Sequence, residues 1–470
     1  MRFRLLTLLL ILPLLMSALT LEEAVERARQ HNRALQKARE NIAAIDAEYR
    51  NVRGSLFPQI SFAGSYQLSK TWLPDSAVPV LPSVTDMLYN SDDLAQPHGL
   101  NDTLLMSNDQ AIAGFLDDAL GGLTPASEQE EASLAAQLKL DQVVFMGGRL
   151  INGLRVVAKV KTLTRRSYFV LEQQVVFETT DLFYAALLTR RVVDIQREAL
   201  DTAQRHYDLV QQMFAQGVVS EYDRLRAELE VAKMRPELTD VENNYRLVME
   251  RLRDQIGWEE GELTLEGEIA MPAVEHLALE AAIAEGLANR TELELASVQV
   301  DINEVLYHTE RGNYLPNIAI SAMYSKFTAS SDFSIEADDF GDMWQVGIGF
   351  QMPLFTGMSN TAKRAGARHE LNKSRLDLRE LQEMIELDVR NSWQQLQHDL
   401  ENVATQENNI ALAQKGLTIA EARFENNVGI QLEVLDAQML YKSTRLQYLQ
   451  SVYRAIMSWE ALQKSLGRTL

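Results

Sequence analysis

Residues 19–66 read LTLEEAVERARQHNRALQKARENIAAIDAEYRNVRGSLFPQISFAGSY, and residues 277–324 align with them without a gap at an offset of 258 positions. A second gapless alignment joins residues 138–257 to residues 348–467 at an offset of 210 positions. Identical residues in the first alignment include Leu21 and Leu279, Tyr49 and Tyr307, Gly54 and Gly312, and Pro58 and Pro316. The sequence therefore predicts two structural repeats, residues 19–260 and 276–470, joined by a linker over 261–275.

Each repeat is predicted to contain a helix, a hairpin of two strands, a long helix and a returning helix. Thr20 and Glu23 form a capping box, and apolar residues recur every seven positions after it. This pattern predicts one coiled-coil helix of about 34 residues that ends before Pro58. Residues 149–216 keep a helical pattern, which corresponds to a length of about 100 Å. The returning helix ends at Gly257 and is expected to be kinked or interrupted at Pro236.

The predicted strands alternate apolar with polar or small residues, in hairpins over 58–145 and 316–355. Each run has about 10 to 14 residues, the length of a strand that crosses a membrane. Aromatic residues stand near the strand ends, as they do at membrane interfaces: Phe57, Trp72, Phe145, Trp344 and Phe355. A soluble sheet of four strands has the same alternation and stays open as an alternative. A further short strand is expected within 258–276.

The N-terminus has the pattern of a secretory signal peptide over residues 1–18. Arg2 and Arg4 precede an apolar run, and Ser17 and Ala18 provide a small-residue cleavage site. This apolar run is too short to span a bilayer as a helix, and no other stretch reaches the roughly 20 apolar residues that a spanning helix needs. Insertion into a membrane is therefore expected to use strands.

Composition excludes several classes of function. The net charge of −21 argues against nucleic acid as a partner, and the absence of cysteine excludes disulfides and thiolate chemistry. Eleven acidic residues and no Lys or Arg fall between positions 71 and 138, so a loop over 73–130 is expected to be acidic, with short helices such as 109–120. The histidines lack metal-ligand spacing, and no nucleotide loop or nucleophile elbow is present, so we expect no metal, no cofactor and no enzyme activity.

Strands that cross a lipid bilayer must close into a barrel, because an open edge would leave backbone groups without hydrogen-bond partners. Four strands cannot close a barrel, since the smallest bacterial barrels have about eight. Several copies of the chain must therefore contribute strands, and the residues themselves give only "more than one".

Four segments resemble the TolC-like outer membrane efflux proteins: residues 19–28, 54–60, 353–357 and 424–438. The resemblance covers both repeats in order. It implies an α+β membrane protein that forms a homotrimer, with a 12-stranded β-barrel in outer membrane lipid, four strands per chain, continuous with a long α-helical coiled-coil barrel in the periplasm. It also implies a passive exit duct of a tripartite efflux or type I secretion system. Its partners would be a periplasmic adaptor (membrane fusion protein) and an inner membrane RND or ABC pump.

The same resemblance places the helix tips, at turns 216–222 and 426–432, at the periplasmic entrance. By similarity, Glu433 and Asp436 match an acidic ring at the closed aperture, and Asp223 matches an acidic residue in closing contacts. The alternative for Asp223 is helix capping with Ser220, and for Glu433 and Asp436 it is a solvated helix face.

Four further residues shape these predicted tip turns: Gly217, Ser220, Phe424 and Gly429. Phe424 and Gly429 stand where the best-known member of the family has a tyrosine and, nearby, an arginine. The closing contacts of those two side chains cannot form in this chain. A soluble periplasmic coiled-coil scaffold, whose sheet only caps the helices, remains the alternative function.

Overall fold

The computed structural model describes residues 19–72, 128–259, 261–275, 277–330, 335, 340–426 and 428–468. The predicted signal segment 1–18 and nearly all of the acidic loop 73–130, with its expected helix at 109–120, lie outside these ranges. The chain divides into two compact units. The helical unit comprises Met1–Ala44, Thr162–Val300 and Ser374–Leu470, and the sheet unit comprises Ile45–Lys161 and Asp301–Lys373.

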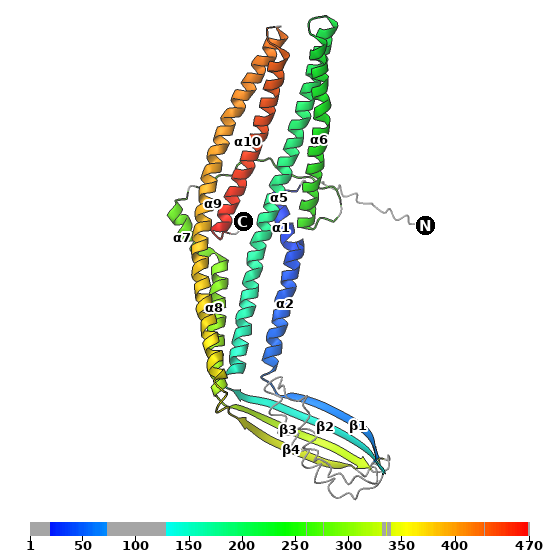
Figure 1. Cartoon of the computed structure of the whole chain (residues 1–470), viewed down its shortest axis with the longest axis vertical. Coiled ribbons are helices and arrows are strands. Elements are labelled where there is room, and N and C mark those ends of the chain that lie inside the picture. The colour runs from blue at the N-terminus through cyan, green and yellow to red at the C-terminus, as the bar shows by residue number, and fades with distance from the viewer. Residues whose placement is uncertain are drawn as a thin grey trace, which may run out of the picture. The chain divides into compact units, whose positions relative to one another are not determined.

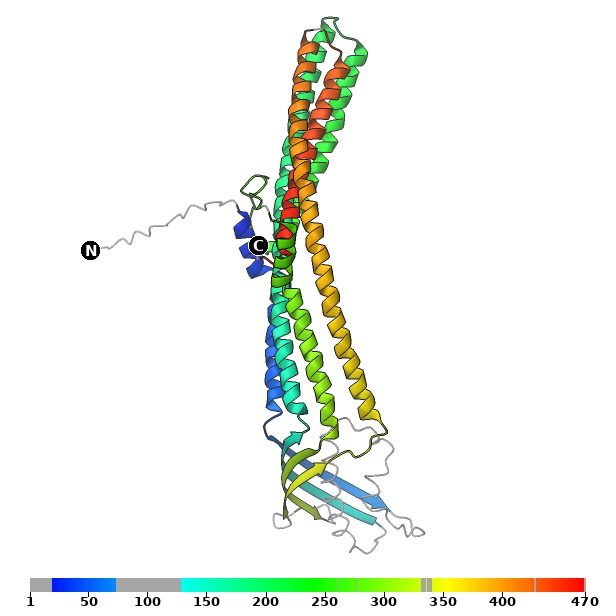
Figure 2. The same ribbon diagram turned by 90° about the vertical axis from the view of Figure 1, so that its left-hand side faces the viewer.

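Two long helices dominate the secondary structure. Helices α5 (Arg149–Ala215) and α9 (Ser359–Glu425) contain 67 residues each, and each returns through a shorter helix, α6 (Glu221–Ile256) and α10 (Gln431–Ser465). Figures 1 and 2 show the resulting pairs, α5 with α6 and α9 with α10, as antiparallel hairpins. The shorter helices are α1 (Leu21–His31), α2 (Arg33–Gly54), α7 (Leu279–Asn289) and α8 (Thr291–Glu310), and a 3-10 turn η2 covers Arg311–Tyr314.

The single helix predicted before Pro58 is wrong in one respect, because it breaks at Asn32 into α1 and α2. The predicted capping box at Thr20 is present. At the break, the Asn32 side-chain oxygen accepts hydrogen bonds from the backbone N–H groups of Ala34 (2.9 Å) and Leu35 (3.4 Å), which caps the second helix. The Asn32 side-chain amide donates to the carbonyl of Gln255 in α6 at 3.1 Å. A contact distant in sequence thus stabilises a break that local periodicity does not indicate.

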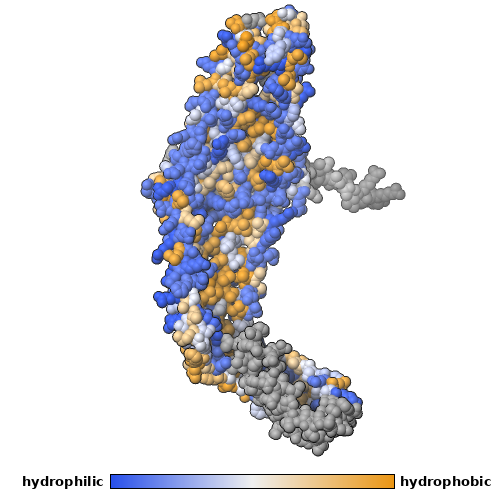
Figure 3. Space-filling model, viewed as in Figure 1, coloured by the Kyte–Doolittle hydropathy of each residue, from blue (hydrophilic) through white to orange (hydrophobic). Residues whose placement is uncertain are grey.

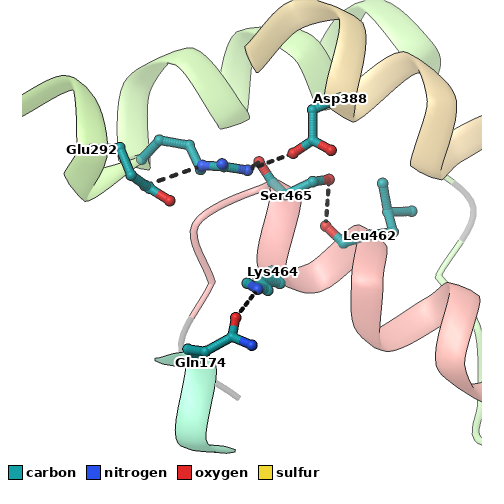
Figure 4. A network of polar contacts seen from close by, with 7 residues as sticks. Gln174, Glu292, Asp388, Leu462, Lys464 and Ser465 are labelled. Atoms are coloured by element: carbon teal, nitrogen blue, oxygen red, sulfur yellow. Dashed lines mark hydrogen bonds and ion pairs between the residues drawn. The ribbon is translucent and has the colours of Figure 1, made fainter. Parts of the chain in front are cut away.

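An equivalent break, 258 positions later, lies at Arg290 between α7 and α8. The Arg290 guanidinium pairs with Glu292 (3.1 Å) and Asp388 (2.8 Å), and it donates to the carbonyl of Ser465 at 3.3 Å. Figure 4 shows Glu292, Asp388 and Ser465 converging on this network, with Lys464 reaching Gln174 beside it. Both breaks therefore contact the end of a returning helix, α6 at Asn32 and α10 at Arg290.

Helix α6 continues through Pro236, so of the two expected outcomes, a kink or an interruption, the interruption does not occur. A proline inside a helix costs about 3 kcal/mol, because it removes one hydrogen bond and crowds the preceding turn. Neighbouring contacts offset this cost. Val231 and Met234 are buried against Ala203, and the Glu237 carboxylate binds Lys442 and Gln196, each at 2.9 Å.

The four predicted strands form one antiparallel sheet of order β1-β2-β3-β4. Their bounds are β1 (Gln59–Trp72), β2 (Glu128–Met146), β3 (Asn317–Ser330) and β4 (Gly341–Gln351). The further strand expected within 258–276 is reduced to a single parallel bridge between Leu19 and Leu265. A register irregularity lies between Val143 and Phe145 of β2.

Several clusters of buried apolar residues lie in the helical unit, and two of them join its shorter helices to the long ones. One joins α1, α2, α5 and α6 around Leu35, Phe183, Leu252 and Ile256. The other joins α7, α9 and α10 around Ile385, Val389 and Leu462. Within the described ranges, no helix carries an apolar stretch long enough to cross a membrane.

Candidate functional site

The sheet carries an exposed apolar face. One row of paired residues crosses all four strands, with Phe62 opposite Leu138, Leu138 opposite Tyr324, and Tyr324 opposite Trp344. Residues opposite one another in a sheet point to the same side, so these four side chains lie together. Phe62 is 74% exposed and Trp344 is 78% exposed. An apolar surface this extensive indicates contact with lipid or with another protein.

The opposite face of the same sheet carries mainly polar or small residues, with Met323 among the exceptions. The adjacent row places Ser61 opposite Lys139, Lys139 opposite Met323, and Met323 opposite Gln345. On β4 burial alternates at every residue from Gly341 to Phe350, and the exposed positions hold most of its apolar side chains. The sheet thus has one apolar face and one largely polar face, which is the alternation typical of the strands of a membrane barrel.

At the first helix tip, Asp223 caps the start of α6. Its carboxylate accepts hydrogen bonds from the Ser220 hydroxyl (2.6 Å) and the Ser220 backbone N–H (3.2 Å), and the Ser220 hydroxyl accepts from the Asp223 N–H. Gly217 provides the turn before it with a left-handed φ of +74°. This geometry fits the capping alternative for Asp223, which leaves its carboxylate bound to its own helix terminus.

At the second tip, Glu433 has a partner that the sequence reasoning missed. Arg423, at the end of α9, lies 3.3 Å from the Glu433 carboxylate across the turn. Gly429 fits this tight turn because a Cβ there would lie 3.0 Å from the Cβ of Arg423. Neighbours on one face of a helix are three or four positions apart in sequence. This spacing does not predict a contact between residues ten positions apart. Asp436 is exposed and, among the described residues, has no ion pair or hydrogen bond.

Phe424 packs inside the helix ends instead of facing the turn. It is buried in a cluster to which all four long helices contribute: Val210 of α5, Ala227 of α6, Ala420 and Phe424 of α9, and Val434 of α10. The exposed apolar residues of the tip turns include Val218, Tyr222, Val428, Ile430 and Leu432. Figure 3 shows hydrophobic atoms mixed with hydrophilic ones over these helix ends, at the top of the view. The tips therefore combine a packed interior with an apolar rim.

The comparison with known protein families identifies the chain. Residues 108–257 and 282–468 match the family model described as outer membrane efflux protein. The chain belongs to the outer membrane efflux protein family. The resemblance predicted from the sequence motifs is thereby confirmed.

Individual relatives of this efflux protein are distant in sequence. Outer membrane efflux protein BepC of Brucella suis biovar 1 (strain 1330) is 22% identical over 360 residues, which cover 74% of this chain and 75% of BepC. Outer membrane protein TolC of Salmonella enteritidis is 20% identical over 345 residues, or 71% of this chain and 69% of that protein. The solved structure of CusC has a TM-score of 0.72 and 17% identity, and the match covers 95% of this chain and 92% of that one. At 17% identity, the similarity to the CusC structure shows a common fold.

His206 is a further tip residue of the efflux protein that sequence reasoning did not select. Its ring lies 5.3 Å from the ring of Phe424, and its Nε2 atom is buried without a hydrogen-bond partner. Burial lowers the pKa of His206, because the charged imidazolium loses its water. The sequence does contain a signal for the burial of His206. It lies three positions after Ala203 and four before Val210, so the three residues share one face of α5, and both neighbours are buried. Across the described residues, no cluster of acids and histidines could hold a metal ion.

We expect acid to destabilise the tips through His206. A group with a lowered folded pKa binds more protons when unfolded, so stability is lost as the pH falls below the unfolded value of about 6.5. Between the unfolded and the folded pKa of His206, each unit of decrease in pH lowers the free energy of unfolding by about 1.4 kcal/mol. Thermal unfolding of His206→Leu should lose this part of the pH dependence, whereas His398→Leu, at an exposed position of α9, should retain it. Equal pH dependence in wild type and His206→Leu would contradict the assignment.

Proposed function

We propose that this efflux protein is a passive exit duct that crosses both the outer membrane and the periplasm. The exposed apolar face of the sheet, with a polar face behind it, is the observation that supports this most directly. Lipid contacts the apolar face and water the polar face, so the sheet is one part of a barrel wall. Substrate passes along the polar interior.

The proposed assembly is a homotrimer with a barrel of twelve strands. Both outer strands of the sheet, β1 and β4, have an edge with no partner in the described chain. In lipid such an edge costs several kcal/mol for each unpaired backbone group, so it must be covered by another copy. The family resemblance supplies the number three, and the long helices form the periplasmic part of the tube.

The proposed domain plan is two repeats, 19–260 and 276–470, with the linker 261–275 between them. The equal lengths of α5 and α9 support this plan. So do the breaks at Asn32 and Arg290, which stand at matching positions and contact matching ends of α6 and α10. Three chains would thus contribute six nearly equivalent repeats to the tube, each with one strand hairpin and one pair of long helices.

The proposed gate lies at the tips, where Asp223, Glu433 and Asp436 would each become a group of three like charges around a narrow opening. Such rings raise the local concentration of cations and bind blocking cations. Asp436 supports this role best, because its carboxylate has no partner among the residues that the structure describes, whereas Asp223 caps a helix and Glu433 pairs with Arg423. Arg423 would reduce the charge of the Glu433 ring and hold its side chain in one orientation.

The proposed partners are a periplasmic adaptor and an inner membrane RND or ABC pump. The apolar rim of the tips, with Tyr222 and Val428 exposed, offers an adaptor a surface on which helix ends can pack. In this scheme the pump supplies the energy, and engagement of the tips opens the duct.

Removing the gate acids should raise the conductance of the closed duct. We expect purified Glu433→Ala/Asp436→Ala trimers in planar bilayers to conduct about tenfold more at rest than wild type, because the loss of six carboxylates removes bound cations from the opening. Glu407→Ala, which removes an exposed acid of α9 far from the tip, serves as the control and should conduct as wild type does. Unchanged resting conductance in the double variant would remove the gate assignment, and no conductance from any variant would contradict the duct itself.

A further inference from the structure

The two strand hairpins share one register. In the first hairpin Phe62 lies opposite Leu138. Moving Phe62 by 258 positions and Leu138 by 210 gives Ile320 and Ile348, which are opposite one another in the second hairpin. The offsets read from the sequence therefore also relate the hydrogen-bonded pairs of the sheet.

The contact between the hairpins, however, occurs only once within the chain. Here β2 pairs with β3, with Leu138 opposite Tyr324 and Gln137 opposite Ser325. The same offsets carry Leu138 to Ile348 in β4, and Tyr324 to Tyr66 in β1. Those two residues lie on opposite edges of the sheet, and neither edge has a partner in the described chain. Both side chains are exposed and belong to the apolar face, so a pairing between them would join like faces.

Glycines at the junctions of strand and helix also make a contact that occurs only once within the chain. Gly147 has a φ of +60°, and a Cβ on it would lie 2.2 Å from the carbonyl oxygen of Gly312. A Cβ on Gly312 would lie 2.3 Å from the carbonyl oxygen of Gly147, so only glycine fits on either side. The offsets carry Gly147 to Gly357, whose φ is +59°, and Gly312 to Gly54. Neither Gly357 nor Gly54 has any neighbour within 4 Å of such a Cβ.

We propose that β4 pairs with β1 of a second copy of this chain in the register that places Ile348 opposite Tyr66 of the partner subunit, and that Gly357 packs against Gly54 of the partner subunit. The inference rests on the proposed assembly of several copies and specifies its interface. The contact between copies reproduces the β2–β3 contact within one chain. Two glycines whose Cβ positions are open in a single chain thereby gain a close neighbour in the assembly.

Cysteine cross-linking tests the register directly, because the chain contains no cysteine of its own. Gln137 lies opposite Ser325, and the same offsets carry Gln137 to Gly347 and Ser325 to Gln67. The proposal therefore places Gly347 opposite Gln67 of the partner subunit, on the polar face. We expect oxidation of Gly347→Cys/Gln67→Cys to link most chains into covalent oligomers on a non-reducing gel. Moving one cysteine by two positions, in Gly347→Cys/Ser69→Cys, displaces it by about 7 Å along the strand, beyond the reach of a disulfide. Gln137→Cys/Ser325→Cys is the control that should form a link within one chain.

Failure of this register and failure of the assembly give different results. Light scattering that shows only monomers in detergent overturns the assembly and this interface with it. Oligomers that cross-link as well through Ser69→Cys as through Gln67→Cys overturn the interface alone.

A glycine substitution tests the packing at the junction. Gly54→Ala has open space in a single chain, so helix content should equal that of wild type, whereas the fraction of assembled protein should fall at least about tenfold, because a Cβ meets the partner's backbone. Gly366→Ala is the matched control, since Gly366 also has no neighbour and the first repeat carries Val156 at the corresponding position. Normal assembly of Gly54→Ala would overturn the packing of Gly54 on Gly357.

Discussion

Replacing Gly312 by alanine is expected to prevent the two strand hairpins from packing in their native register. The new Cβ would lie 2.3 Å from the carbonyl oxygen of Gly147 and 3.2 Å from Cγ of Arg149. Backbone atoms cannot retreat as the end of a flexible side chain can, so the two segments must separate. Overpacking typically costs about 1 to 3 kcal/mol, and a clash between backbone atoms is expected at the upper end of this range.

The separation would also break a polar cluster at the same junction. Across the junction, the Arg149 guanidinium donates to Asn317 at 2.5 Å and to Asn313 at 3.3 Å. Loss of these bonds adds to the cost, because hydrogen bonds to charged groups contribute about 1.5 to 3 kcal/mol each. The measurement is the urea midpoint of unfolding, or the yield of protease-resistant protein.

Gly366→Ala is the matched control, since a Cβ at Gly366 meets nothing and Gly366 has no proposed role between copies. We expect Gly366→Ala to unfold at the wild-type midpoint, while Gly312→Ala unfolds earlier or fails to fold. A wild-type midpoint for Gly312→Ala would show that the junction can open without cost, and that the close approach of the two glycines does not matter.

Much of the fold follows from local patterns in the sequence. The strands were predicted by alternation, and the capping boxes at Thr20 and Ser220 depend on residues only three positions apart. The break at Asn32 was missed because its stabilising contact, the carbonyl of Gln255, is 223 positions away. At Pro236 the sequence leaves a kink or an interruption open, because the contact that favours a continuous α6, between Glu237 and Lys442 of another helix, is also distant in sequence.

At the helix tips, too, contacts between residues close in sequence could be predicted, whereas contacts between distant residues could not. Capping of Asp223 was open to prediction, because the bond is local. The pairing of Arg423 with Glu433 crosses a turn, and the burial of Phe424 depends on four helices that meet at the tip. His206 escaped notice because a polar residue among apolar positions reads as exposed until its neighbours Ala203 and Val210 are seen to be buried.

Placing an arginine on the apolar face of the sheet is expected to block membrane insertion. Val346 lies in the middle of β4 and is 64% exposed, in the row that continues through Ala322 to Leu140. An arginine facing lipid near the bilayer centre costs about 2 to 4 kcal/mol, and a trimer would carry three. We therefore expect Val346→Arg to be nearly absent from outer membrane fractions and to be degraded or retained as unassembled protein.

The neighbouring residue provides a control with the same added charge. Gln345 lies on the polar face, so Gln345→Arg adds an arginine one position away that would point into water. We expect its yield in the outer membrane to be close to that of wild type, since substitutions facing the interior of a barrel leave its lipid contacts unchanged. The comparison separates the orientation of the side chain from the effect of an added charge.

The outcome also discriminates between the duct and the soluble periplasmic scaffold. In a scaffold the apolar face would pack on protein, and wild type would be recovered from the soluble periplasm. Equal yields of Val346→Arg and Gln345→Arg in the same fraction would mean that lipid does not contact this face. A loss confined to Val346→Arg, with wild type in the outer membrane, would assign the exposed row of Val346 to the lipid side of the barrel and the row of Gln345 to its interior.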